Sequence, residues 1–241
     1  LGSIILLGLV AGLGTCLGAL LVIACGSLRP GAVSLMLGLA SGIMVAVILC
    51  DLLPSSLEYG NPLMALKGFL GGTLLMAALD LLLNLLSPAA RPGRDYLKMG
   101  YLIALGIALH DLPEGFAIAA GFAAAEKLGP ILVIAIGLHN IPEGMATAAP
   151  LRYGGCSGAR VLAINMLISL VTPLGTFIGL VLVEASRTFI GLLLAFAAGA
   201  MIFVVVEELV PEAQAEGNGH LATAGTMLGF TIMMILDVAL G

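Results

Sequence analysis

The chain has 241 residues, of which 61% are hydrophobic and only 10% are charged, and it contains 33 glycines and no tryptophan. A soluble domain usually has about 45–50% apolar and about 25% charged residues. So few charges cannot solvate a globular surface, which excludes a soluble enzyme, a secreted scaffold, a disordered protein and a nucleic-acid-binding protein. The composition therefore predicts a small integral membrane protein.

Apolar stretches of about 20 residues recur along the chain, and this is the length with which an α-helix crosses a bilayer. They lack the strict alternation of outer-membrane barrel strands. We therefore expect an all-α membrane protein with eight transmembrane helices, at residues 3–24, 33–55, 63–86, 97–125, 130–151, 160–184, 188–211 and 221–240. Because the connections are short, residues 1–241 are predicted to form a single transmembrane domain.

The basic residues predict the orientation of these helices. Loops on one side of the bundle hold six of the nine Lys and Arg residues, namely Arg29, Arg91, Arg94, Lys98, Arg152 and Arg160. The other side holds Lys67, Lys127 and Arg187. The side richer in Lys and Arg normally faces the cytoplasm. An even number of helices then places both termini outside the cytoplasm.

An internal repeat relates the first three predicted helices to the last three at a constant offset of 157 residues. The matched positions carry carboxylates, prolines, glycines and threonines, in the pairs Thr15 and Thr172, Gly18 and Gly175, Asp51 and Glu208, Pro54 and Pro211, Gly72 and Gly229, and Asp80 and Asp237. Partners lie five helices apart and so cross the membrane in opposite directions. This predicts a 3+2+3 arrangement, with repeats at 1–86 and 160–241 around central helices at 97–151. Such inverted repeats are typical of transporters.

The two central helices carry related motifs, HDLPEG at 110–115 and HNIPEG at 139–144. On an α-helix with about 100° per residue, each glutamate projects between the histidine and the following Asp or Asn. Two such faces in opposition would form a metal site, whose ligands would be His110, Asp111, Glu114, His139, Asn140 and Glu143. Imidazole and carboxylate ligands suit zinc, iron(II), manganese(II) or cadmium better than copper(I). The geometry allows a binuclear centre bridged by the two glutamates.

Proline interrupts both motifs near the middle of their hydrophobic spans. Pro113 and Pro142 cannot donate to the carbonyls of Leu109 and Leu138, so each helix is predicted to kink and leave a free carbonyl. In hydrocarbon, such a carbonyl is tolerated only where protein, water or an ion satisfies it. A single buried His–Glu pair is equally compatible with a polar contact between helices. Two matched motifs favour a metal site.

Further acidic residues fall inside or near the predicted spans, where each ionisable group costs about 2.5–3.5 kcal/mol and usually marks a pathway. Outside the two motifs these acids are Asp51, Asp80, Glu207, Glu208 and Asp237. We include Asp51, Glu207 and Glu208 in a candidate transport pathway. Met44 joins them because a thioether can help a soft cation, with core packing as the alternative. The four cysteines form no paired CxxC motif and are expected to pack as small apolar residues.

HDLPEG followed 29 positions later by HNIPEG, with DLLP at 51–54, EELVPE at 207–212 and TPLG at 172–175, resembles the ZIP family of divalent metal transporters. The likeness covers essentially the whole chain, and the compact form is most similar to the bacterial GufA-like branch. The resemblance implies eight helices, extracytoplasmic termini, and a homodimer in the lipid bilayer of a bacterial inner membrane. It also implies inward movement of zinc and related ions as substrates, without a resident cofactor or a nucleic-acid partner.

The resemblance further implies roles for individual residues. The six motif residues would form the transport site, Met44 can reach the primary metal, and Glu207 and Glu208 lie on the release route. Some relatives have an acidic residue where this chain has Thr172, so a second metal is expected to bind more weakly here. Position 207 can be histidine in relatives, which predicts a different release rate or metal preference. The loop at 87–95 has no histidine cluster, so no metal-sensing loop is expected.

Two other functions compete with a carrier. A passive channel for divalent metals would use the same ligands, and the sequence separates it poorly from a carrier. An intramembrane metalloenzyme would need an HExxH motif or an ExxH motif with spacing i, i+3, and neither occurs here. We therefore expect a transporter and not an enzyme.

Overall fold

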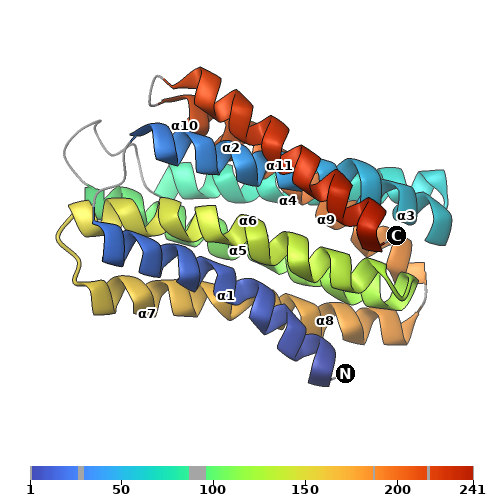
Figure 1. The fold of residues 1–241 in the computed structure, drawn as a ribbon. Coiled ribbons are helices and arrows are strands. Elements are labelled where there is room, and N and C mark those ends of the chain that lie inside the picture. Colours follow the sequence, from blue (N-terminus) through green and yellow to red (C-terminus); the bar gives the residue numbers. More distant parts are fainter. Residues whose placement is uncertain (1, 27–29, 87–95, 187, 216–217, 241) are drawn as a thin grey trace.

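The computed structural model describes residues 2–26, 30–86, 96–186, 188–215 and 218–240, and these parts are helical throughout apart from short connections (Figure 1). Eight of the helical spans are long and apolar enough to cross a membrane, as the sequence predicts. The loop at 87–95, with Arg91 and Arg94, and the basic residues Arg29 and Arg187 lie outside the described residues.

The helices follow one another without a strand among the described residues. They are α1 (Gly2–Cys25), α2 (Pro30–Ala46), η1 (Val47–Leu52), α3 (Leu53–Tyr59), α4 (Pro62–Leu86), α5 (Tyr96–Ala124), α6 (Leu128–Tyr153), α7 (Gly158–Ser169), α8 (Val171–Ala185), α9 (Thr188–Val204), η2 (Val205–Leu209), α10 (Val210–Ala215) and α11 (Gly219–Leu240). The second span thus comprises α2, η1 and α3, the sixth α7 and α8, and the seventh α9, η2 and α10.

Two of the predicted helices contain a π-helical segment, and in each case a proline follows. Pro54 and Pro211 have no backbone N–H to donate to the preceding turn, so regular α-helical bonding is interrupted at η1 and η2 before it resumes in α3 and α10. Such segments occur frequently at functional sites. In contrast, α5 and α6 run as single helices through Pro113 and Pro142. The predicted sixth helix divides at Leu170, close to Pro173, which cannot donate to the carbonyl of Ser169.

The helices pack in two groups. The central bundle consists of α1, α5, α6, α7 and α8, in which α1 packs on α6 and α8 packs on α5. The frame consists of α2, α3, α4, α9, α10 and α11, with η1 and η2, and in it α2 packs on α11 and α4 on α9. The two groups meet where α5 contacts α9 and where α2 contacts α6. In Figure 1 the central bundle lies below the frame.

Glycines bring the helices of the central bundle into close contact beside the two motifs. A Cβ atom on Gly144 would meet the backbone of Thr15 in α1, and one on Gly115 would meet the backbone of α8 near Thr172. On the facing helices, a Cβ atom on Gly18 in α1 would likewise meet the backbone of α6 near Gly144, and one on Gly175 in α8 would meet the backbone of α5 near Gly115. Because each motif ends in one of these glycines, the backbone approach lies directly next to its glutamate. The helices that carry the glutamates are therefore held by backbone contact.

The two termini lie at one end of the molecule, together with α3, while α10 and the connection from α6 to α7 lie at the opposite end (Figure 1). Leucine side chains are numerous on the outer surface, as in Leu74 and Leu167, which are 66% and 68% exposed. A surface of this kind suits lipid, because lipid tails are as apolar as leucine. Among the described residues, the buried acidic and histidine side chains other than Asp51 all lie on α5 and α6.

Candidate metal centre

The six motif residues come together where α5 and α6 pack side by side. They are His110, Asp111 and Glu114 from α5, and His139, Asn140 and Glu143 from α6, and none of them is more than 2% exposed. Each trio lies near the middle of its helix, as the helical spacing of the motifs predicts. Buried charged groups are expensive unless they are paired or bind a metal.

The histidine of each helix faces the glutamate of the other. His139 Nε2 lies 2.7 Å from Glu114 Oε1, and His110 Nε2 lies 3.4 Å from Glu143 Oε2. Asp111 Oδ1 lies 3.8 Å from the same nitrogen of His110. The crossed arrangement places donors from both helices around one small volume, so that neither helix alone provides the site.

Four of these residues are spaced for a shared cation. His110, Asp111, Glu114 and Glu143 each offer a ligand atom, and these atoms all lie within 4.8 Å of one another. Metal–ligand bonds of zinc to nitrogen or oxygen are about 2.0–2.2 Å long, so a small contraction would bring these atoms around one ion. The charge of the three carboxylates favours a divalent cation.

Many polar atoms of the cluster have no hydrogen-bond partner within the described protein. They include both ring nitrogens of His110, both carboxylate oxygens of Asp111 and Glu143, Oε2 of Glu114, Nδ1 of His139 and Oδ1 of Asn140. Leaving a buried polar group unsatisfied costs about 1–3 kcal/mol. A cation that these atoms bind would satisfy several of them together. These nitrogen and oxygen atoms without hydrogen-bond partners are therefore the observation that most directly indicates a set of metal ligands.

Asn140 and Asp111 occupy equivalent motif positions but have different surroundings. The amide nitrogen of Asn140 donates to the carbonyl of Ala11 in α1, at 3.2 Å, while its Oδ1 has no hydrogen-bond partner among the described residues. Asp111 lies beside the hydroxyl of Thr172 in α8. On the side of the cluster that faces α8, Asp111 therefore provides a carboxylate and Thr172 a hydroxyl. On the side that faces α1, Asn140 provides an amide.

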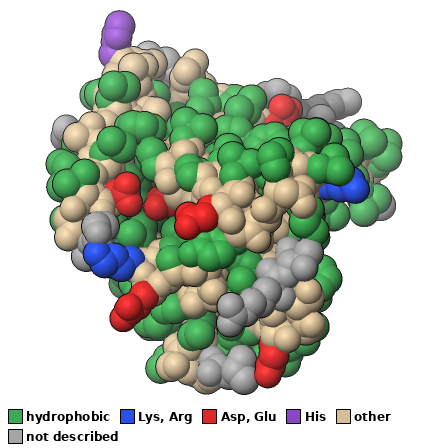
Figure 2. Space-filling model, turned by 90° about the vertical axis from the view of Figure 1, so that its right-hand side faces the viewer, with side chains coloured by type: hydrophobic (Ala, Val, Ile, Leu, Met, Phe, Trp, Pro, Cys, Tyr) green, Lys and Arg blue, Asp and Glu red, His purple; other side chains and the backbone are tan. Residues whose placement is uncertain are grey.

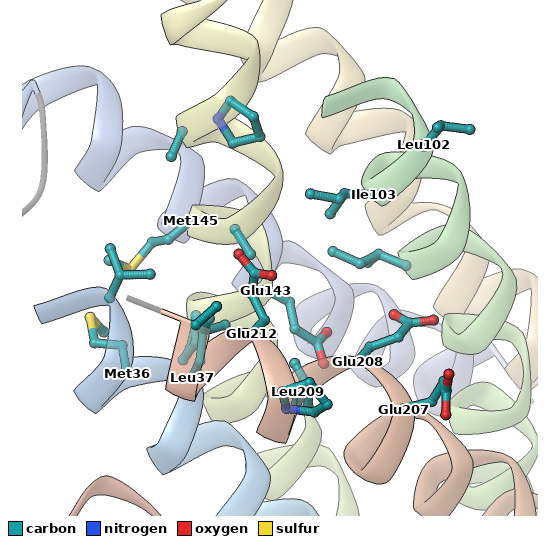
Figure 3. A pocket seen from close by; sticks show the side chains of 18 of the residues that line it. Met36, Leu37, Leu102, Ile103, Glu143, Met145, Glu207, Glu208, Leu209 and Glu212 are labelled. Carbon is teal, nitrogen blue, oxygen red and sulfur yellow. The ribbon is translucent and has the colours of Figure 1, made fainter. Parts of the chain in front are cut away.

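A cavity of about 770 Å³ reaches the cluster from one end of the molecule. His110 and Glu143 lie in its wall, and its other acidic lining residues are Asp80, Glu207, Glu208 and Glu212. Figure 3 shows Glu143, Glu207, Glu208 and Glu212 around this space. Tyr96 and Tyr153 also line the cavity, from the start of α5 and the end of α6. The cavity lies between the central bundle and the frame, because both groups contribute to its lining.

Of the four predicted pathway residues, two line the cavity and two do not. Glu207 and Glu208 line the cavity, and Glu208 is close enough to His110 and Glu143 to interact electrostatically with both. Met44 and Asp51 are buried, with 0% and 5% exposure, and neither lines the cavity. The transport role of Met44 and Asp51 stays a prediction.

Two acidic lining residues were absent from the predicted pathway. Asp80 belongs to the acids that the sequence places inside the membrane, but nothing local connects α4 with the motifs. Glu212 ends the EELVPE segment, and the sequence alone predicts no role for it. The only indication in the sequence that Asp80 belongs to the pathway is its charge inside a predicted span. Its position beside the cavity depends on the packing of α4 against α9.

Eight apolar spans around a buried cluster of imidazole and carboxylate donors, reached by an acidic cavity, define a membrane protein that handles metal cations. The family model described as ZIP Zinc transporter matches residues 89–237. The chain belongs to the ZIP zinc transporter family, which confirms the resemblance found in the motifs. This family consists of transporters and not of enzymes.

Individual relatives support the same family. The zinc transporter ZupT of Corynebacterium glutamicum is 35% identical over an alignment of 251 positions, gaps included, which covers 95% of this chain and 95% of that protein. The zinc transporter GufA of Myxococcus xanthus is 38% identical over 141 residues, or 58% of this chain and 56% of that protein. Human zinc transporter ZIP11 is 42% identical over 159 residues, or 63% of this chain. The chain spans about half the length of the ZIP11 proteins it matches.

Proposed function

We propose that this chain carries divalent transition-metal cations, above all zinc, into the cytoplasm through the cluster between α5 and α6. The single observation that carries the proposal is the set of crossed His–Glu pairs, buried midway along two apolar helices, with several nitrogen and oxygen atoms that have no hydrogen-bond partner among the described residues. Ionisable groups at this depth in a membrane protein usually mark a substrate or ion pathway. The relatives described above are all named zinc transporters, which supports the same substrate.

The donor set supports zinc, with cadmium, iron(II) and manganese(II) as further substrates. Neutral imidazole and carboxylate oxygen are common zinc ligands, and the same mixture suits other first-row divalent metals. The cluster contains no sulfur among its six residues, which disfavours copper(I). The metal is a transported substrate in this proposal, and no resident cofactor is needed.

The direction of transport is proposed from the cavity and the basic residues. The cavity opens beside the start of α5 and the end of α6, where Lys98, Arg152 and Arg160 also lie. The positive-inside rule assigns this end to the cytoplasm. The structure then corresponds to an inward-facing state, with both termini on the extracytoplasmic side of a plasma membrane, which is the inner membrane in a bacterium.

An inverted repeat is supported by the way the helices pack. If α1, α2 and α4 correspond to the sixth, seventh and eighth spans, then α1 on α6 corresponds to α8 on α5, and α2 on α11 corresponds to α9 on α4. The contact of α2 with α6 likewise corresponds to that of α9 with α5. Transport would follow from an elevator-like or rocking movement of the central bundle against the frame, because this boundary already contains the cavity.

A binuclear centre is the finer part of the proposal. Glu114 and Glu143 would bridge one ion on the histidine side and a second ion on the side of Asp111 and Asn140. Thr172 offers this second position only a hydroxyl, so the second ion would bind more weakly. Anomalous scattering from zinc-soaked crystals should show two peaks about 3.5–4 Å apart. A single peak at saturating zinc would overturn the proposal of a binuclear centre but would not contradict the proposed transport site.

Flux through the protein in proteoliposomes tests the function itself. Zinc influx should exceed that of empty liposomes, saturate with zinc concentration, and accelerate when zinc is present on the opposite side. Influx that rises linearly over a wide concentration range, without such acceleration, would favour a passive channel. No influx above that of empty liposomes would overturn the proposal. The homodimer that the family resemblance implies stays a prediction, which cross-linking in native membranes tests.

A further inference from the structure

Two buried hydroxyl groups meet inside the central bundle, between α1 and the end of α7. The hydroxyl oxygens of Thr15 and Ser169 lie 2.7 Å apart and share a hydrogen bond. The thiol of Cys16 lies 3.2 Å from the same oxygen of Ser169. Thr15 and Ser169 are fully buried, and neither belongs to the two motifs or lines the cavity. The transport function proposed above therefore gives this contact no role.

The two hydroxyl groups also face carbonyls of their own helices. Thr15 Oγ1 lies 2.7 Å from the carbonyl oxygen of Gly12, and Ser169 Oγ lies 2.9 Å from that of Asn165. A hydroxyl has one proton to donate, so one of the two donates to the other while the acceptor donates to its own carbonyl. In either direction both protons have an acceptor. The contact is therefore a satisfied hydrogen bond between α1 and α7.

The outer faces of the same two helices are apolar. Leu17 in α1 is 53% exposed and Leu167 in α7 is 68% exposed, and each lies two residues from one of the hydroxyl groups. Hydrophobic side chains are also numerous on the face shown in Figure 2, which looks onto the end that holds the termini. Lipid tails are as apolar as leucine, so the hydrophobic effect does not fix the distance between helices in a bilayer. Hydrogen bonds and close packing must fix it here.

The hydroxyl bond connects the two helices that support the glutamates of the metal centre. Each glutamate is followed by a glycine, Gly115 in α5 or Gly144 in α6, whose added Cβ atom would meet the backbone of a neighbouring helix. Gly144 lies against the backbone of Thr15 itself. Gly115 lies against the carbonyl of Thr172 in α8, three residues beyond Ser169. The bond thus joins the support of one glutamate to the support of the other.

The internal repeat does not provide a second bond of this kind. At the offset of 157 residues, Thr15 corresponds to Thr172 and Ser169 corresponds to Gly12. Gly12 has no side chain, although its added Cβ atom would lie only 3.1 Å from Thr172 Oγ1. Thr172 Oγ1 accordingly has no hydrogen-bond partner among the described residues. Of the two equivalent positions, only the one with Thr15 and Ser169 connects α1 to the sixth span by a hydroxyl pair.

We propose that Thr15 and Ser169 are positioning residues, which hold the two glutamates close together and thereby make the site prefer Zn²⁺ to the larger Cd²⁺. The ligand atoms of the cluster lie within 4.8 Å of one another, whereas two ligands of a tetrahedral zinc ion are only about 3.4 Å apart. The cluster must therefore contract around zinc. Without the hydroxyl bond the two supports can separate, and the wider cluster suits the longer bonds of Cd²⁺. This inference rests on the function proposed above.

The ratio of the Cd²⁺ and Zn²⁺ transport efficiencies, each measured as kcat/KM in proteoliposomes, tests the positioning role. Thr15→Val keeps the shape of the side chain but removes the hydroxyl, and Ser169→Ala removes the other hydroxyl while sparing the contact of Thr15 with Gly12. Each variant should raise the ratio several-fold. The double variant should raise it no further, because either substitution alone breaks the bond. Thr15→Ser retains a hydroxyl and should keep the wild-type ratio.

Thr73→Val is a matched control for the loss of a hydroxyl contact between helices. Thr73 Oγ1 in α4 lies 3.0 Å from the carbonyl oxygen of Gly199 in α9, within the frame. This variant should leave the ratio unchanged, even where circular dichroism shows that it melts at a lower temperature. An unchanged ratio in both Thr15→Val and Ser169→Ala, or an equal rise in Thr73→Val, would overturn the positioning role.

The positioning role and the proposed function can fail separately. If the wild-type protein transports zinc but the hydroxyl variants keep the wild-type ratio, the positioning role is overturned and the proposed function stands. If the wild-type protein transports no metal, the proposed function fails. Isothermal titration calorimetry of the purified full chain with Zn²⁺ and with Cd²⁺ then decides the positioning role, because the ratio of the two affinities should shift in the same variants and in the same direction.

Discussion

Replacing Gly144 with alanine is expected to slow transport although the glycine offers no ligand atom. Gly144 follows Glu143 and lies against the backbone of α1 at Thr15. An added Cβ atom would lie only 2.6 Å from the Cα atom of Thr15. Carbon atoms in contact are normally about 3.5–4.0 Å apart, so α1 and α6 must separate by about 1 Å. Because both groups are backbone, no side chain can rotate away to relieve the overlap.

The magnitude follows from two opposing contributions. Overpacking of a well-packed interior costs about 1–3 kcal/mol, and a clash between two backbones belongs near the upper value. Alanine in place of glycine within a helix recovers up to about 1 kcal/mol. The net cost is therefore about 2 kcal/mol, which lowers the population of the native packing relative to alternatives by a factor of about 30. Glu143 moves with this part of α6, so the metal site is distorted as well.

Gly137→Ala provides a matched control in the same helix and against the same neighbour. A Cβ atom on Gly137 would lie 3.6 Å from the Cα atom of Ala11, which is an ordinary contact. Zinc influx into proteoliposomes and thermal unfolding followed by circular dichroism should both separate the two variants, with Gly144→Ala slower and less stable. The chain has no tryptophan, which is why circular dichroism replaces fluorescence. Equal influx and equal melting of the two variants would refute the close-contact argument.

Three further outcomes are expected from the site. Glu114→Ala and Glu143→Ala should each abolish zinc influx, because each glutamate meets the histidine of the other helix; a Glu143→Ala protein that moves zinc at the wild-type rate would make the site assignment wrong. Asp111→Ala and Asn140→Ala should reduce influx without abolishing it, which measured rates can separate from complete loss. Glu208→Gln should lower the maximal rate more than it changes KM, since this carboxylate lines the cavity beyond the ligands; a larger change in KM would contradict a role in release.

The sequence by itself determined the spans, the family and the residues proposed as metal ligands. Runs of apolar residues record the length of each crossing, and the spacing within HDLPEG and HNIPEG places histidine and glutamate on one side of a helix, because both are properties of a single helix. The break at Leu170 was harder to predict, since proline disturbs a membrane helix only as far as its neighbours permit. The same local reasoning expects kinks at Pro113 and Pro142; there the helices continue without a break, and the kinks themselves stay a prediction.

Only the tertiary structure decided which groups meet. The crossing of His139 with Glu114 and of His110 with Glu143 requires α5 and α6 to pack in one particular register. The acidic cavity draws Asp80 from α4 and Glu208 from η2, segments that are far apart in the chain. Apolar helices have no preferred partner that can be read from hydropathy, because lipid is as apolar as another helix. Close contacts between backbones, at positions such as Gly144, select the partners and thereby place the ligands.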